Sequence, residues 1–181
     1  MLVLSSAEEL RAFLSRVLVP GRTAIIGVGN ELRCDDGFGS YVARSLANIL
    51  ARYSQRECVA TVDAGAAPEV YTDLLSMEGV LFILDAVEAP VAESEVVVIG
   101  RDEIPEYSVL LSTHTIGLDR LMAFVRGDIY IIGTRPRCLE LRLGVSRPVA
   151  QAAQRVVRAF IEVFRDLGCL RLPSPAYGPS R

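Results

Sequence analysis

Four carboxylates follow three short apolar segments of the sequence, at the points where predicted strands end. They are Asp35 and Asp36 after residues 23–28, Asp63 after residues 59–62, and Asp85 after residues 80–84. Clustered carboxylates repel one another unless a cation, a proton or hydrogen-bond donors relieve the repulsion. A loop or helix-cap hydrogen bond accounts for any single acid. Three successive segments that each end in an acid favour a shared site.

The chain has one histidine, His114, in the stretch LSTHTIG over residues 111–117. A single histidine in a loop rich in serine and threonine commonly caps a helix or forms a hydrogen bond. Two carboxylates and one imidazole would instead offer mixed oxygen and nitrogen ligands, which suit a borderline divalent ion such as nickel, zinc or iron. Both roles are open to His114 on the residues alone.

The elements that must position these residues follow from the hydrophobic pattern. Ser6 and Glu9 form a capping-box pattern that begins the first helix. Strands are predicted over residues 23–28, 59–62, 80–84, 95–99 and 128–133, and helices over residues 7–18, 38–50, 67–77, 116–125 and 149–167. Strands that are apolar on both faces and alternate with helices predict a sheet between two helical layers. Ligands of such sheets bind beyond the carboxyl ends of the strands, where the acids lie.

Composition limits the class of protein. A chain of 181 residues that is 51% hydrophobic and 23% charged predicts one folded domain and excludes a disordered or coiled-coil chain. The net charge of −3 gives no electrostatic basis for binding nucleic acid or an anionic membrane surface. All 19 basic residues are arginine, which excludes a Schiff-base or P-loop lysine.

The first residues of the chain and the spacing of its cysteines predict where in the cell the protein is found and whether its thiols are reduced. No apolar run reaches the roughly 18 residues that a membrane span needs. The first residues, MLVLSSAEEL, lack a basic region and a cleavage signal, so a cytoplasmic protein is predicted. Cys34, Cys58, Cys138 and Cys169 are far apart and form no CxxC motif, which predicts reduced thiols rather than a disulfide framework.

Taken together, the motifs resemble those of the maturation endopeptidases of [NiFe] hydrogenases, over residues 23–168. Residues 27–39, GVGNELRCDDGFG, resemble the family's glycine-asparagine loop and the acidic pair that follows it. The other matching motifs are Asp63-Ala-Gly65, Asp85-Ala86, Ser112-Thr-His114, and residues 133–136 with residues 143–146. Ala66 departs from a common threonine, residues 138–144 lack a frequent glycine, and about twenty residues precede the usual start; these departures concern substrate docking most.

The resemblance implies a fold, a partner and a set of site residues. The fold is a three-layer α/β/α sandwich around a mixed five-stranded sheet with one strand antiparallel to the others. It gives a single peptidase domain over residues 1–170, with an extra helix within residues 1–20 and a loose tail over residues 171–181. The partner is the hydrogenase large-subunit precursor, whose C-terminal extension the family removes once nickel has been installed. Asp36, Asp85 and His114 take the positions of the family's metal ligands and catalytic residues.

The same resemblance implies that nickel arrives with the precursor and that no organic cofactor is needed. Two routes to hydrolysis stay open. The metal can polarise the carbonyl or activate water, or a carboxylate can act as general base, in keeping with the family's classification as aspartic-type peptidases.

Three other functions are compatible with parts of the sequence. A dinucleotide-binding oxidoreductase would use Gly27, Gly29 and Asp63, but Leu32 stands where the third glycine of the motif belongs. A cysteine peptidase would pair Cys34 with His114, but the two acids beside Cys34 would suppress its thiolate. A non-catalytic module that only checks the precursor for nickel would use the same residues as the peptidase.

Overall fold

The computed structural model describes residues 1–53, 58–71, 79–104 and 125–170. Its six strands are β1 (Leu2–Leu4), β2 (Thr23–Val28), β3 (Ala60–Gly65), β4 (Val80–Ala86), β5 (Val96–Gly100) and β6 (Asp128–Thr134). Its helices are α1 (Ala7–Val17), α2 (Phe38–Leu50) and α6 (Arg147–Asp166), and three short 3₁₀ helices are η1 (Cys34–Gly37), η2 (Pro68–Tyr71) and η3 (Arg101–Glu103). The predicted tail over 171–181 lies outside the described residues, as do the predicted helix over 116–125, except for Val125, and most of the predicted helix over 67–77.

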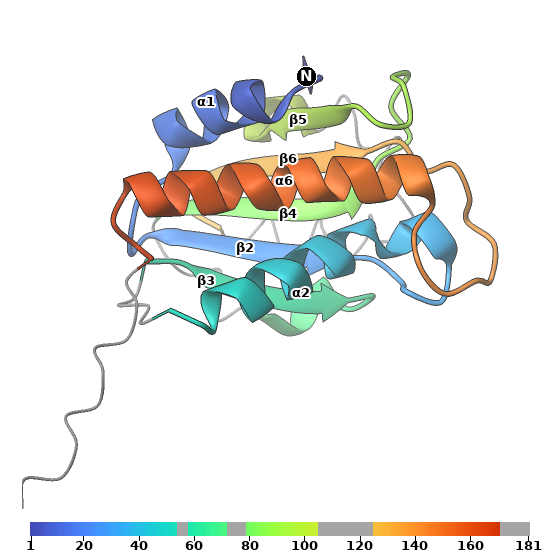
Figure 1. Cartoon of the computed structure of the whole chain (residues 1–181), viewed down its shortest axis with the longest axis horizontal. Helices are drawn as coiled ribbons and strands as arrows, with labels where there is room; N and C mark the ends of the chain where they lie inside the picture. Colours follow the sequence, from blue (N-terminus) through green and yellow to red (C-terminus); the bar gives the residue numbers. More distant parts are fainter. Residues whose placement is uncertain (54–57, 72–78, 105–124, 171–181) are drawn as a thin grey trace, which may run out of the picture.

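The strands form one mixed sheet in the order β1-β5-β6-β4-β2-β3 (Figure 1). Strands β3, β2, β4 and β6 are parallel, whereas β5 is antiparallel both to β6 and to β1. The prediction of a mixed sheet with one reversed strand is therefore confirmed. The predicted number of five strands is one too low, because β1 pairs Leu2–Leu4 with Val96–Val98. Three residues directly before a helix are too short to display the alternation that identifies a strand.

Apolar side chains of alternating strand positions are buried on both faces of the sheet. On β4, Phe82 and Leu84 join the cluster beneath α1, α2 and α6, whereas Leu81 and Ile83 join the cluster on the opposite face. Figure 1 shows the three helices side by side over the first face. The second cluster is also buried, with Ile104 and Val125 contributing to it, so both faces are covered. This agrees with the predicted three-layer arrangement.

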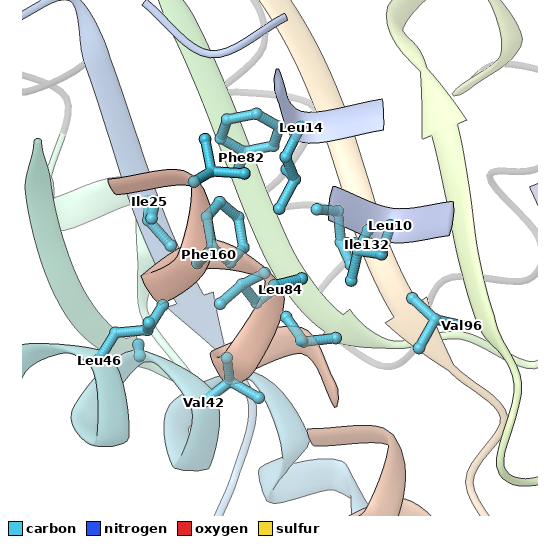
Figure 2. Packing of buried hydrophobic residues seen from close by; sticks show 14 of the residues in the cluster. Leu10, Leu14, Ile25, Val42, Leu46, Phe82, Leu84, Val96, Ile132 and Phe160 are labelled. Atoms are coloured by element: carbon cyan, nitrogen blue, oxygen red, sulfur yellow. The ribbon is translucent and has the colours of Figure 1, made fainter. Parts of the chain in front are cut away.

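Helix α6 crosses the centre of the first face, and its aromatic side chains fix it there. The ring of Phe160 meets the ring of Phe82 edge to face, with the centroids 5.3 Å apart (Figure 2). The predicted apolar stripe is confirmed from Val149 to Phe164. It is wrong at Leu167, which is 42% exposed, because the helix ends before it. Within the described part of the chain, no helix combines the length and the apolarity that crossing a bilayer requires.

The cysteines differ from the prediction of reduced thiols. Cys34 is bonded to Cys138 and Cys58 to Cys169, with Cα atoms 5.9 and 5.7 Å apart. Cys58–Cys169 joins the chain before β3 to the residues after α6. The partners are 104 and 111 residues apart in sequence, so no local spacing motif could have identified them. The prediction is wrong because the fold, not the spacing, brings the partners together.

Tyr130 gives the core a measurable dependence on alkaline pH. Burial between Phe13 and Phe82, and then the charge of Asp128, raise the pKa of Tyr130 above its ordinary value of 10.0. The folded state therefore holds the phenolic proton more tightly than the unfolded state. This contribution to stability is complete below pH 10.0 and is lost as the pH rises through the raised pKa.

The free energy of unfolding, measured by chemical denaturation, should fall between pH 8 and roughly pH 11 in the wild type. We expect this fall to be smaller in Tyr130→Phe, which has no phenolic proton to lose. Asp128→Asn removes only the second cause of the shift and should weaken the dependence in part. An unchanged alkaline slope in Tyr130→Phe would contradict the assignment.

Candidate functional site

Helix α2 begins directly on the carboxyl ends of β2 and β4, which brings the acidic pair to the sheet. A Cβ atom on Gly39, in the first turn of α2, would collide with the backbone carbonyl oxygens of Val28 and Leu84. Only glycine permits an approach this close. The approach places η1, which carries Asp35 and Asp36, beside the end of β4.

Asp36 is buried at the end of β2, with 2% of its surface exposed. The backbone N–H of Asn30 donates a hydrogen bond to its Oδ2 atom at 3.2 Å. Gly29 has a φ of +143°, and a Cβ atom there would collide with the carbonyl oxygen of Asp36. The glycine-asparagine turn therefore folds η1 back over the strand end and holds the Asp36 carboxylate there.

Asp85 is the last residue but one of β4 and is fully buried. Its Oδ1 atom accepts a hydrogen bond from the N–H of Ala86 at 2.8 Å. On the neighbouring strand it lies opposite Gly133, where a Cβ atom would crowd the side chain of Val87 and the carbonyl oxygen of Asp85. Two buried carboxylates thus lie at the carboxyl ends of two adjacent parallel strands, Asp36 in η1 beside β2 and Asp85 on β4.

The third predicted ligand, His114, lies outside the described residues. The structure brings Asp36 and Asp85 to the same end of the sheet. A meeting of His114 with these two acids stays a prediction.

Asp35 serves the fold as a hydrogen-bond acceptor and is neither a helix cap nor a candidate base. It is fully buried and accepts hydrogen bonds from the N–H groups of Arg137, Cys138 and Ser146 and from the hydroxyl of Ser146, at 2.5 to 3.0 Å. It does not cap α2, because the N-cap of that helix is Gly37 and no side chain caps it. Nor is it placed as a base, since both oxygens already accept hydrogen bonds. It anchors the connection between β6 and α6 to η1.

The connection between β6 and α6 is fixed in two further ways. Arg33 and Arg142 form an isolated parallel bridge, in which the N–H of Cys34 donates to the carbonyl oxygen of Arg142 at 2.8 Å and the N–H of Arg142 donates to that of Leu32 at 2.9 Å. The disulfide Cys34–Cys138 joins the same two segments. We refer to residues 137–146 as the anchored segment.

The sulfur atoms of Cys34 and Cys138 and a carboxylate oxygen of Asp35 lie within 4.8 Å of one another, the one such group of three among the described residues. It is not a metal site here, because the sulfurs are bonded together and Asp35 is fully hydrogen-bonded. The disulfide also removes Cys34 as a nucleophile, against the cysteine-peptidase alternative.

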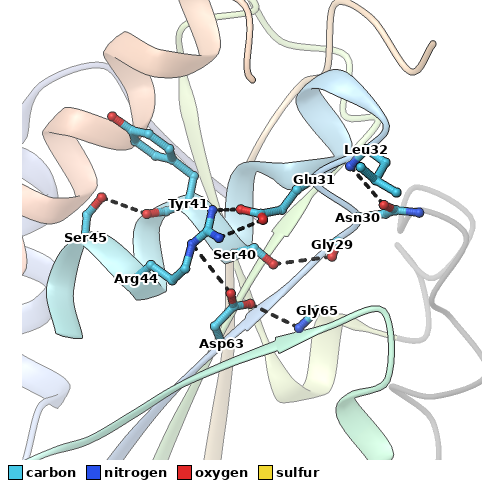
Figure 3. Close-up of polar contacts among 10 residues, drawn as sticks. All are labelled: Gly29, Asn30, Glu31, Leu32, Ser40, Tyr41, Arg44, Ser45, Asp63 and Gly65. Carbon is cyan, nitrogen blue, oxygen red and sulfur yellow. Dashed lines mark hydrogen bonds and ion pairs between the residues drawn. The ribbon is translucent and has the colours of Figure 1, made fainter. Parts of the chain in front are cut away.

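Asp63, on β3, forms a hydrogen bond and an ion pair with neighbouring residues (Figure 3). Its Oδ1 atom accepts a hydrogen bond from the N–H of Gly65 at 3.1 Å, and its Oδ2 atom lies 3.7 Å from Nε of Arg44. Arg44 also pairs with Glu31. Asp63 is thus compensated by a neighbouring guanidinium, which argues against the ribose-binding role required by the oxidoreductase alternative.

Asp35→Ala is expected to lower the free energy of unfolding by about 3 kcal/mol, because three partly buried backbone N–H groups lose their acceptor together. Chemical denaturation measures the change. Asp63→Ala is the control: this half-exposed ion pair is worth at most about 1 kcal/mol. Equal losses in the two variants would contradict the anchoring role of Asp35.

Comparison with known proteins places this geometry in a family. The family model of hydrogenase maturation proteases matches residues 42–163. The Methanocaldococcus jannaschii protein MJ0631, whose name assigns it to the hydrogenase maturation proteases, is 29% identical over 155 residues, covering 81% of this chain and 90% of its own. The Azotobacter vinelandii hydrogenase expression/formation protein HoxM is 26% identical over 153 residues, covering 80% of this chain and 72% of its own.

Solved structures agree on the fold. The [NiFe] hydrogenase maturation protease HycI from Thermococcus kodakarensis has a TM-score of 0.69 at 23% identity, covering 87% of this chain and 99% of its own. The hydrogenase maturating endopeptidase HybD from Escherichia coli has a TM-score of 0.67 at 23% identity, covering 84% of this chain and 97% of its own. With its acidic pair, its buried Asp85 and two thirds of its length under one family model, the chain belongs to the hydrogenase maturation proteases.

Proposed function

We propose that this protein removes the C-terminal extension of a [NiFe] hydrogenase large-subunit precursor after nickel has been installed. The observation that carries the proposal is the pair of buried carboxylates, Asp36 and Asp85, at adjacent strand ends. Membership of the protease family supports the reaction class. The reaction would take place in the cytoplasm, on a precursor that has not yet been processed.

Asp36, Asp85 and His114 are proposed to bind the nickel ion of the substrate. Two carboxylates and an imidazole suit such an ion and leave positions for ligands from the precursor. Because the metal belongs to the substrate, a precursor without nickel lacks this contact and loses the corresponding binding energy. The site would therefore process a large subunit only after nickel has been inserted.

Hydrolysis requires a water molecule to attack the scissile carbonyl carbon, with its proton taken up by a base and the amine leaving group protonated. A carboxylate at the site supplies the base in the aspartic-type route. The substrate's metal, held by the same residues, supplies polarisation in the other route.

The decisive experiment incubates the protein with nickel-loaded and with nickel-free precursor and measures the intact mass of each. The expected result is loss of a C-terminal peptide from the nickel-loaded precursor alone. Equal cleavage of both precursors would contradict recognition of nickel. Formation of a stable complex without any loss of mass would instead support the non-catalytic checking module.

A further inference from the structure

We propose that a Leu–Arg face, made of Leu32, Arg33, Leu141, Arg142 and Leu143, binds the precursor through a segment that carries apolar and acidic side chains. The inference rests on the proposed function, because it assigns this face to the same precursor. The face lies on the two segments that the Arg33–Arg142 bridge joins, and one of these continues directly into Asp36.

The three leucines of the face are unusually accessible. Leu32, Leu141 and Leu143 are 59%, 86% and 74% exposed. Each lies one position away from a residue of the bridge, so the bridge gathers the leucines from two distant parts of the sequence. Single exposed leucines are ordinary, but several together mark a surface that another molecule covers.

These leucines are not exposed merely because they lie on a loose loop. The backbone beneath them is held by the bridge, by the hydrogen bonds to Asp35 and by the Cys34–Cys138 disulfide. A surface fixed in advance loses little conformational entropy when a partner binds. The constraints therefore favour binding of a partner to this face.

A cavity of about 220 Å³ opens beside Leu143. Its walls include Gly37, Tyr41, Gly144 and Val145. Glu31 and Arg44 also line it, and Figure 3 shows the ion pair between them. The cavity provides a place for an apolar side chain next to the exposed leucines, which is the arrangement by which interfaces anchor a partner.

The charge of the face identifies the chemistry of the partner segment. The whole chain carries a net charge of −3, yet the anchored segment and the residue that follows it contain Arg137, Arg142 and Arg147 with one acid, Glu140. Among the described residues, no carboxylate forms an ion pair with Arg33 or Arg142. The guanidinium groups of Arg33 and Arg142, with no carboxylate partner among the described residues, lie next in sequence to the exposed leucines and complement a segment that mixes acidic and apolar residues.

The test compares steady-state cleavage of nickel-loaded precursor, and equilibrium binding to it, for two double variants of the face. Arg33→Glu with Arg142→Glu reverses the charge, and Leu141→Ser with Leu143→Ser removes the apolar contacts. Arg52→Glu, just after α2, and Leu167→Ser, at the C-cap of α6, are matched controls at exposed positions. Circular dichroism verifies that the surface variants are folded.

We expect each face variant to raise KM and Kd at least about tenfold, with kcat nearly unchanged, and the controls to match the wild type. Added salt should weaken binding by the wild type more than binding by the charge-reversed variant. Unchanged KM and Kd in both face variants would overturn the proposal and leave the protease function standing. A wild type that binds without cleaving, with binding lost in the face variants, would overturn the protease function and support the docking surface.

Discussion

Asp85→Asn is expected to abolish processing of nickel-loaded precursor, lowering kcat/KM at least about 100-fold, without unfolding the protein. The substitution keeps the shape of the side chain and the oxygen that accepts the Ala86 N–H, but removes the negative charge. A neutral amide binds a divalent ion weakly and cannot take a proton from water. Asp36→Asn should have an effect of the same order for the same reason.

Precursor cleavage measured by intact mass, with thermal unfolding as a check on folding, reports the effect. Asp63→Asn is the matched control, since this acid also lies in the carboxyl-terminal half of a sheet strand but is paired with Arg44. It should keep activity close to the wild-type value. Near wild-type cleavage by Asp85→Asn or Asp36→Asn would remove that residue from the mechanism, and a similar loss in Asp63→Asn would show that the assay reports general electrostatics instead.

Replacing both partners of the Cys58–Cys169 disulfide by serine is expected to lower the free energy of unfolding by about 4 kcal/mol. The bond closes a loop whose ends are 111 residues apart, and in the chain-entropy description long loops gain the most from a cross-link. For a domain of this size, the loss corresponds to a fall in Tm of roughly 10 °C. Activity at low temperature should be retained, because this bond joins the start of β3 to the end of α6, away from the acidic pair.

The matched variant replaces Cys34 and Cys138 by serine. Its loss of stability should be similar, because its partners are 104 residues apart, but it should also impair cleavage by releasing the anchored segment beside Asp36. Titration of thiols in unreduced, denatured protein provides the direct measurement. Four free thiols, together with a Tm that does not respond to reductant, would contradict both bonds.

Features with a local signature in sequence were predicted well. The range 23–28 for β2 is that observed, and the capping box at Ser6 begins α1 as expected, with Glu9 reaching back to the N-cap backbone. Such features depend on neighbouring residues, on apolar runs and on helix caps, all of which are visible in a single sequence. The strand-end positions of Asp36 and Asp85 followed from the same local patterns.

Features that depend on distant residues were missed. The anchor at Asp35 requires donors more than 100 residues away, at Arg137 and Ser146, and no pattern around Asp35 distinguishes it from Asp36. The Asp35 carboxylate accepts hydrogen bonds that hold the fold together, whereas the Asp36 carboxylate lies at the strand end as a candidate site residue. The disulfides and the bridge of Arg33 to Arg142 are equally non-local. A sequence can show which types of residue are present, whereas the pairing of remote segments emerges only from the folded chain.

The short first strand, β1, also hinders aggregation through the edge of the sheet. Without β1, the valines of β5 would present a free row of backbone donors and acceptors along an apolar strand, which is a template for pairing with another chain. By covering that row, β1 leaves an outermost strand only three residues long. A three-residue edge strand offers a second molecule few backbone groups with which to pair, so β1 lowers the tendency of the protein to aggregate.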